Sequence, residues 1–330
     1  IQTPQQAFSI LGKTKDRTMQ KKLTIATRKS PLALWQAYHV RDALEQMYPG
    51  LNVQLLEMST EGDERLDVSL TKIGGKGVFV KALEHALFDG RADLAVHSLK
   101  DVPMALPDGL ELACYLARET PSDAMVCRSD LVPWSSMASV PQGARIGTSS
   151  LRRVAQLMAI RPDLHITPVR GNLGTRLAKL DANAFDALML ATAGLKRLDL
   201  AHRIAFETRP EDVLPACGQG ILGIEIRSKD VAVRQILAPL ADQEATPVAR
   251  CERALNRFLN GGCQVPIAAY AIREGSQLWL RALVGSADCS QVIRAEARGL
   301  VTAPEDLGVL VGQDLERQGA RELLAGVGHS

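Results

Sequence analysis

Arginines occur repeatedly in this sequence near the predicted ends of strands or starts of helices. They are Arg28, the pair Arg152 and Arg153, Arg170, Arg176 and Arg197. In an open α/β sheet, ligands bind beyond the carboxyl ends of the strands, where the first amides of the following helices also attract anions. A guanidinium stays charged and grips a carboxylate or phosphate through two parallel hydrogen bonds. The pattern therefore predicts an anion cleft, although any one of these arginines taken alone is more often solvated helix surface.

A second group of polar residues follows a predicted apolar strand, in the segment from His97 to Pro103. Lys100 and Asp101 place a cation beside a carboxylate there. Asp101 could transfer protons or stabilise a cationic intermediate, or it could simply accept turn hydrogen bonds before the proline. His97, on the apolar strand itself, is more typical of a core histidine with satisfied hydrogen bonds.

Two glycine-rich loops carry further candidates. Cys263 lies in Asn260-Gly-Gly-Cys-Gln-Val-Pro266, which would leave its sulfur accessible as a nucleophile, but most lone cysteines are small buried hydrophobes. Gly74-Gly-Lys-Gly77 lacks the spacing of a nucleotide-binding phosphate loop and is either a mobile flap, with Phe79 just beyond it, or an ordinary turn. The six cysteines show no C-x-x-C pair and no zinc-type spacing, so we expect no metal.

Length and composition limit the class of protein. A chain of 330 residues predicts two or three domains, and 46% hydrophobic with 23% charged residues is typical of a globular protein. Lys+Arg 39 against Asp+Glu 37 gives a net charge of +2, and aromatic residues make up only 4%, which argues against binding nucleic acid. The sequence has neither a signal-peptide core nor an apolar run of about 18 residues, so we expect a cytoplasmic protein that does not enter a membrane. Residues 1–22 are expected to be a disordered tail, with Met19 as a possible start.

The elements that must position these residues alternate between strand and helix. Strands are predicted at 23–27, 53–58 and 94–98, with a helix that begins after Ser30-Pro31 and another at 79–88. The alternation begins again at Asp123, with strands at 124–127, 145–147, 166–169 and 187–190 and helices at 151–160 and 173–180. Such alternation predicts two α/β units with parallel sheets.

The remaining third of the chain has a different pattern. A strand is predicted at 221–226, followed by helices at 231–240 and 248–259. Antiparallel strands are predicted over 267–298, with turns at Glu274-Gly275 and 286–288, and a final helix at 305–325 would cover one face of that sheet. We therefore expect a smaller C-terminal α+β domain.

Taken together, these segments resemble the porphobilinogen deaminase (hydroxymethylbilane synthase) family. The resemblance covers nearly everything after Lys22 and follows the family order of motifs. The motifs are Thr24-Ile-Ala-Thr-Arg-Lys-Ser-Pro-Leu-Ala-Leu-Trp-Gln36, Gly74-Gly-Lys-Gly-Val-Phe79, Val96-His-Ser-Leu-Lys-Asp-Val-Pro103, Gly147-Thr-Ser-Ser-Leu-Arg-Arg153, Arg170-Gly-Asn-Leu-Gly-Thr-Arg176, Leu190-Ala-Thr-Ala-Gly-Leu-Lys-Arg197, Gly218-Gln-Gly220 and Gly261-Gly-Cys-Gln-Val-Pro266.

The resemblance implies two α/β domains like those of type II periplasmic binding proteins, joined by a hinge, and a third domain that carries the cofactor cysteine. Domain 1 would comprise residues 23–117 and a returning segment, 221–240. Domain 2 would comprise 122–216 and domain 3 would comprise 243–330.

The same resemblance implies the reaction. Four porphobilinogen molecules would be condensed head to tail, each losing ammonia, onto a dipyrromethane cofactor held by a thioether to Cys263, before water releases hydroxymethylbilane. Loss of ammonia creates a positively charged azafulvene, which a buried carboxylate at Asp101 would stabilise. Each pyrrole carries an acetate and a propionate, which suit arginine partners.

By resemblance, further residues surround the cofactor and substrate. Those assigned to the cofactor, besides Cys263, are Ser98, Lys100, Thr148, Ser149, Ser150, Arg152, Arg153, Arg170 and Arg176. Those assigned to the substrate are Arg28, Ser30, Gln36, Phe79, Asn172, Arg197 and Gln219. The family implies a monomer whose product could pass to uroporphyrinogen III synthase. The alternative is a non-catalytic, two-lobed anion-binding protein, which would leave the cysteine domain without a purpose.

Overall fold

The computed structural model describes residues 21–59, 80–131, 134–262 and 265–325. The chain forms two compact units. Unit 1 consists of Ile1–Ala117 with Ile221–Thr246, and unit 2 consists of Arg118–Gly220 with Pro247–Ser330.

Unit 1 is built on a five-stranded mixed sheet. Its strands are β1 (Lys21–Arg28), β2 (Leu51–Met58), β3 (Leu94–Ser98), β4 (Leu110–Tyr115) and β10 (Leu222–Arg227). In the order β2-β1-β3-β10-β4, the first three strands are parallel, while β10 runs antiparallel to both of its neighbours. The strand that completes this sheet therefore comes from a distant part of the sequence.

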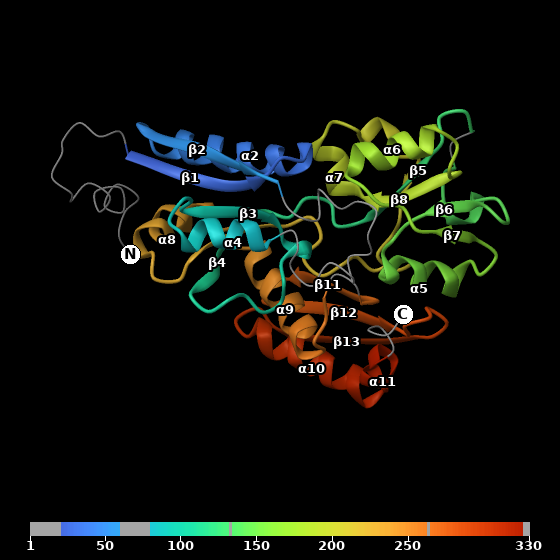
Figure 1. Cartoon of the computed structure of the whole chain (residues 1–330). Helices are drawn as coiled ribbons and strands as arrows, with labels where there is room; N and C mark the ends of the chain where they lie inside the picture. Colours follow the sequence, from blue (N-terminus) through green and yellow to red (C-terminus); the bar gives the residue numbers. More distant parts are fainter. Residues whose placement is uncertain (1–20, 60–79, 132–133, 263–264, 326–330) are drawn as a thin grey trace. The chain divides into compact units, whose positions relative to one another are not determined.

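Helices cover both faces of this sheet (Figure 1). They are α2 (Pro31–Met47), α4 (Lys81–Phe88) and α8 (Val231–Leu237), with short 3-10 turns η1 (Leu99–Asp101) and η4 (Ala238–Leu240). Alternating strand residues such as Ile25 and Ile224 share a core with α2 and α8, while Ala26 and Ala95 pack beneath α4. The period-two pattern thus buries opposite faces of one sheet under different helices.

The first sheet of unit 2 has the same arrangement of strands. It contains β5 (Asp123–Cys127), β6 (Arg145–Gly147), β7 (His165–Thr167), β8 (Ala187–Ala191) and β9 (Phe206–Glu207). In the order β7-β6-β8-β5-β9, β6 is parallel to β7 and β8, and β5 is antiparallel to β8 and β9. Its helices and turns are η2 (Met137–Ser139), α5 (Leu151–Ile160), α6 (Leu173–Asp181), α7 (Thr192–Arg197) and η3 (Ala201–Arg203).

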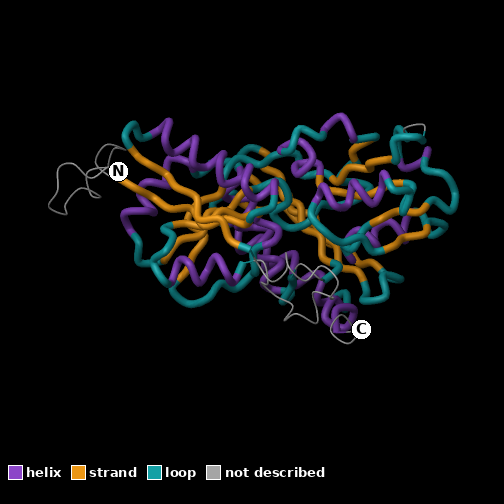
Figure 2. The backbone as a smooth tube through the Cα atoms, turned by 45° about the horizontal axis from the view of Figure 1, so that its top comes forward, coloured by secondary structure: helices purple, strands orange, loops and turns teal. Residues whose placement is uncertain are grey.

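A second, antiparallel sheet completes unit 2. It consists of β11 (Ile267–Glu274), β12 (Gln277–Gly285) and β13 (Val292–Leu300), which pair as consecutive hairpins. Its helices are α9 (Ala245–Phe258), α10 (Pro304–Arg317) and α11 (Ala320–Ala325), and Figure 1 shows α10 and α11 lying along this sheet. Figure 2 shows the helices and strands of the described residues by colour. Two α/β sheets and a small C-terminal sheet confirm the predicted fold class, but the prediction that the α/β sheets are parallel is wrong, because β10 and β5 each run antiparallel to both of their neighbours.

Two predicted helices end earlier than the sequence pattern indicates. The last helix, expected over 305–325, is interrupted at Gly319, which has φ +95° and separates α10 from α11. A glycine with positive φ commonly ends a helix. The apolar periodicity that predicts a single helix therefore spans two helices separated by this glycine. The helix expected over 231–240 ends at Leu237, because Pro239 interrupts the α-helical bonding and the chain continues as η4. Within the described residues, no helix is long and apolar enough to span a bilayer.

The packing of α10 on α9 depends on a glycine. A Cβ at Gly308 would clash with the Cys251 carbonyl oxygen and lie 2.8 Å from the Ala254 Cβ. We expect Gly308→Ala to lower the free energy of unfolding by about 1–3 kcal/mol, because the overpacking outweighs the gain in helix propensity. Urea unfolding measures this change.

The matched control is Leu310→Ala on the same helix, where the side chain is 49% exposed. This change should alter the free energy of unfolding by less than about 0.5 kcal/mol. Equal stability of Gly308→Ala and wild type would show that α9 and α10 are not closely packed at this position.

Candidate functional site

The predicted residues of unit 1 meet at one edge of its sheet. Arg28 ends β1 and Ser98 ends β3, and because these strands are parallel their carboxyl ends lie at the same edge. Ser30 caps α2, its hydroxyl accepting a hydrogen bond from the Ala33 amide at 3.4 Å. A cavity of about 80 Å³ has as its polar lining Arg28, Ser30, Gln36, His97, Ser98 and Asp101. Residues far apart in the sequence are therefore assembled around one small cavity.

The cavity has an internal hydrogen bond but an exposed carboxylate. Gln36 Nε2, on α2, donates to Ser98 Oγ at 2.8 Å. Asp101 is exposed, not buried as the sequence argument expects, because η1 carries it beyond the end of β3. Lys100, in the same turn, is half-buried. An exposed carboxylate beside a cavity is accessible to a substrate but is not desolvated by the protein alone.

The predicted residues of unit 2 also follow the carboxyl ends of parallel strands. Thr148, Ser149 and Ser150 follow β6 and lead into α5. Arg170 and Asn172 follow β7, and the Asn172 side chain caps α6 by accepting from the Thr175 amide at 2.9 Å. The structure thus places donors from two loops and two helix starts at one sheet edge, which is favourable for binding an anion.

Arg152 and Arg153 are the most buried of the predicted arginines, and both face one carboxylate. Arg152 Nη2 lies 2.9 Å from Asp123 Oδ2, and Arg153 Nη2 donates to Asp123 Oδ1 at 2.7 Å. Arg152 Nη1 also donates to the Leu214 carbonyl at 2.6 Å, and Arg153 Nη1 to the Met189 carbonyl at 2.8 Å. Because two guanidiniums share one carboxylate, a buried positive charge remains at the start of α5.

Asp123 is fully buried on β5 and was not singled out from the sequence. Burial alone would raise the pKa of its carboxyl, but Arg152, Arg153 and the Gln219 side chain together hold that pKa well below its usual range. Gln219 Nε2 donates to Asp123 Oδ1 at 2.9 Å and to the Pro121 carbonyl at 2.6 Å. Gln219, expected to contact substrate, therefore lies buried beside this carboxylate.

The other predicted arginines of unit 2 are less buried and bond to the main chain. Arg197 Nη2 donates to the Gly220 carbonyl at 2.7 Å, and burial lowers the pKa of this guanidinium to about 10 against the opposing effect of Glu119. Arg176 Nε donates to the Gly171 carbonyl at 2.8 Å, while Arg170 is exposed. The Arg197 and Arg176 side chains are therefore each held by a main-chain carbonyl of unit 2.

A second buried carboxylate that the sequence analysis missed is Glu252 on α9. It accepts from Arg118 Nη1 at 2.7 Å, from the Gly218 amide at 2.7 Å and from the Ala271 amide on β11 at 2.8 Å. Glu252 therefore fixes the Gly218–Gly220 segment, which carries Gln219, against the C-terminal sheet. Its charge within the apolar face of a predicted helix was the available signal.

Four predicted features lie wholly or partly outside the described residues: most of the tail (residues 1–20), Phe79, the Gly74–Gly77 loop and Cys263. The last two residues expected in the tail, Lys21 and Lys22, are instead the start of β1. Among the residues that the structure does describe, no group of three or more metal-ligating side chains is found.

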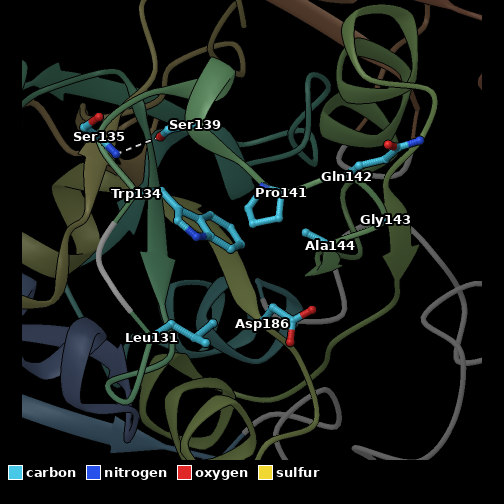
Figure 3. A pocket seen from close by; sticks show the side chains of 9 residues that line it. All are labelled: Leu131, Trp134, Ser135, Ser139, Pro141, Gln142, Gly143, Ala144 and Asp186. Carbon is cyan, nitrogen blue, oxygen red and sulfur yellow. Dashed lines mark hydrogen bonds between the residues drawn. The ribbon is translucent and has the colours of Figure 1, made fainter.

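A larger cavity lies at the other end of the unit 2 sheet. Its volume is about 540 Å³, and Figure 3 shows Trp134, Pro141 and Asp186 pointing into it. Ala144 and Asp186 immediately precede β6 and β8, so this cavity is at the amino ends of these strands. Asp186 is already bound by the amide and guanidinium of Arg145, at 2.9 Å and 2.8 Å. This cavity is separate from the predicted site.

Comparisons with known proteins agree with the motifs. The family model described as porphobilinogen deaminase, dipyromethane cofactor binding domain, matches residues 23–235, and that of the porphobilinogen deaminase C-terminal domain matches residues 247–317.

Three of the solved structures to which the chain has a weak similarity are named as binding proteins. A probable amino-acid transporter extracellular-binding protein, ytmK from Bacillus subtilis, is 8% identical with a TM-score of 0.40, covering 67% of this chain and 90% of that chain. The periplasmic aliphatic sulphonate binding protein SsuA from Escherichia coli is 16% identical with a TM-score of 0.38, covering 72% and 70%. The methionine binding protein MetQ is 13% identical with a TM-score of 0.42, covering 66% and 89%.

The Asp123 network predicts a stability change with a defined pH dependence. Asp123→Asn leaves two buried guanidiniums without a carboxylate and should lower the free energy of unfolding by about 3–5 kcal/mol at pH 7. Because the folded pKa of Asp123 is lowered, its stabilisation is complete above the ordinary carboxyl pKa of about 4 and is lost as the pH falls towards the folded value. Urea unfolding of both proteins from pH 7 to pH 3 should therefore show the difference narrowing at the acid end.

Asp212→Asn, which breaks the exposed Arg209–Asp212 pair, is the control. It should cost no more than about 1 kcal/mol. A similar small cost for Asp123→Asn would contradict a structural role for the buried carboxylate.

Proposed function

Because the chain belongs to the porphobilinogen deaminase family, we propose that it condenses four porphobilinogen molecules head to tail, with loss of ammonia at each step, and releases hydroxymethylbilane. The observation that carries this proposal is the match of both family domains, over residues 23–235 and 247–317. A simple anion-binding protein would have no need of the second domain.

The residues of unit 2 suit the cofactor of this family, whose pyrrole rings carry carboxylates. The edge that follows β6 and β7 combines a buried positive charge at Arg152 and Arg153 with the hydroxyls of Thr148, Ser149 and Ser150. The Nε atoms of both buried arginines have no hydrogen-bond partner among the described residues. Such a donor-rich edge fits a polycarboxylate, and Arg170 and Arg176 would add guanidiniums to it.

We propose that Cys263 holds the dipyrromethane cofactor through a thioether bond. When bound, the cofactor supplies the pyrrole carbon to which the first substrate is joined. Arg152 and Arg153 would act on its carboxylates mainly through charge, because their Nη atoms already bind Asp123 and main-chain carbonyls. Asp123 and Gln219 would then hold these arginines in place.

The cavity of unit 1 suits the reacting end of the substrate. Arg28, with the hydroxyl of Ser30 and the amide of Gln36, would bind substrate carboxylates beside Asp101. The Asp101 carboxylate would stabilise the positive charge that develops as ammonia leaves and would exchange a proton there. Lys100 and Ser98 are proposed to support the cofactor, and Phe79, Asn172 and Arg197 to complete the substrate contacts, whereas the buried Gln219 would act only by holding Asp123 and the arginines.

Further details of the proposal concern the protein in its cell. We propose that it acts as a cytoplasmic monomer and passes its product to uroporphyrinogen III synthase.

The intact mass of the purified protein tests the cofactor and its attachment. Two ten-carbon pyrrole units, each joined with loss of ammonia, should add roughly 420 Da to the native chain and nothing to Cys263→Ala. Cys289→Ala, which removes another cysteine of the same unit, should keep the adduct. A native mass equal to that of the bare chain after incubation with porphobilinogen would favour the alternative, a non-catalytic anion-binding protein.

Substitution of Asp101 tests the catalytic assignment. Asp101→Asn should lower the rate of porphobilinogen consumption by about 10²–10⁴-fold, because the amide can neither exchange a proton nor stabilise a cation as a carboxylate does. The measurement is steady-state turnover of cofactor-loaded protein. Asp108→Asn, at another exposed aspartate of unit 1, should leave turnover at the wild-type rate. Wild-type turnover by Asp101→Asn would refute the assignment.

A further inference from the structure

Three titratable side chains are buried beneath α4 in unit 1. Glu84 lies on the inner side of α4, His97 on β3 and Glu225 on β10, with exposed fractions of 7%, 6% and 0%. In the sheet register, Gly223 pairs with His97 and Glu225 with Ala95, so both polar residues are on the face that carries Ala95 and packs against α4. This layer is otherwise formed mainly by alanines and leucines. Burying two acids and a histidine there lowers the stability of the fold, so their presence favours a functional role.

The contacts within this cluster leave one carboxylate oxygen unsatisfied. The Nε2 atom of His97 lies 2.9 Å from Glu225 Oε2. Glu225 Oε1 is buried and has no hydrogen-bond partner in the described part of the chain. A buried carboxylate with only one oxygen bonded is well placed to accept a further proton.

Glu84 is affected by the same carboxylate. Burial first, and then the charge of Glu225, raise the pKa of Glu84 to about 7, while His97 and Lys81 act in the opposite direction. Charged or titratable groups on the elements around α4 also include Lys81 and His85 on α4, Lys22 and Arg28 on β1, Glu57 on β2, Glu111 on β4, Asp101 at the cavity, and Arg227 on β10, which bonds the Leu87 and Ala92 carbonyls. Near neutral pH the Glu84 carboxyl is therefore divided between its protonated and ionised forms.

His97 connects this cluster with the proposed active site. It lines the same cavity as Asp101, Ser98 and Arg28, and its Nε2 is bonded to Glu225. An imidazole with one nitrogen fixed by a carboxylate and its ring at a cavity wall is the usual arrangement for passing protons.

We propose that Glu84, Glu225 and His97 form a proton-holding cluster that serves the Asp101 cavity, with His97 passing the proton between the cavity and the two carboxyls. The role in turnover rests on the proposed function. In that reaction the C–N bond of the aminomethyl group breaks and a C–C bond forms, ammonia leaves, and a pyrrole carbon gives up one proton. Because ammonia leaves before the C–C bond forms, the cluster accepts that proton in the later step and returns it through His97 to the cavity, where ammonia or water carries it away before the next cycle, and no bond between heavy atoms of the protein changes.

The resting protein tests the cluster without any substrate. In infrared pH titrations of the full chain, the wild type should show a protonated buried carboxyl that disappears near pH 7, the value at which Glu84 ionises. Glu84→Gln should lack this signal, while the matched control His85→Gln, at the exposed neighbouring position on α4, should keep it. Since Glu84→Gln removes a buried acid without changing its shape, it should fold. A signal that persists in Glu84→Gln would overturn the proposal.

Turnover of porphobilinogen tests whether the cluster serves the site. The ionisation near pH 7 in the wild-type pH profile should be absent in Glu84→Gln and present in His85→Gln. Glu225→Gln and His97→Gln should lower the maximal rate by about 10²-fold with KM little changed. Wild-type pH profiles in all these variants would overturn the proposal. A wild type that consumes no porphobilinogen would refute the proposed function instead, and the infrared titration would still decide whether the cluster holds a proton.

Discussion

The buried carboxylate of Asp123 is the constraint on which much of unit 2 depends. It has no exposure to solvent, and it is kept ionised by two guanidiniums that enter from the first turn of α5. The buried Asp123 carboxylate and the two guanidiniums would each destabilise the fold strongly if the other were absent. Strand β5, helix α5 and the Gln219 segment therefore have to fold together. The hydrogen-bond donors in the loops at this sheet edge are therefore positioned by the ion pairs of Asp123 with Arg152 and Arg153.

Unit 1 repeats this design with different residues. In each sheet one antiparallel strand lies beside the parallel strands, β10 beside β3 and β5 beside β8, and each carries a fully buried acid. Glu225 binds a histidine, whereas Asp123 binds arginines. The first arrangement leaves a group that can exchange protons, and the second leaves a permanent positive charge. Under the proposed function, the two similar sheets would serve proton exchange and anion binding respectively.

Periodicity in the sequence was enough to place most elements. The strand Leu94–Ser98 and the helix Leu151–Ile160 are found at the predicted residues, because each has a clear apolar pattern and recognisable ends. The partners of buried charges could not be predicted in this way. Glu225 is 128 residues from His97, and Asp123 is 96 from Gln219, so only tertiary structure brings them together. The exposure of Asp101 was also missed, since residue type alone does not show how far a turn extends beyond a sheet.

The insertion of β10 between β3 and β4 has a consequence for how the chain is made. Among the described strands, β4 pairs with β10 alone, and β10 begins at Leu222. When the ribosome has synthesised the first half of the chain, β1 to β4 have all been made, but the strand that joins β3 to β4 has not. Until the fifth emerges, β3 and β4 expose unpaired edges, and a nascent chain in that state is a natural client for chaperones.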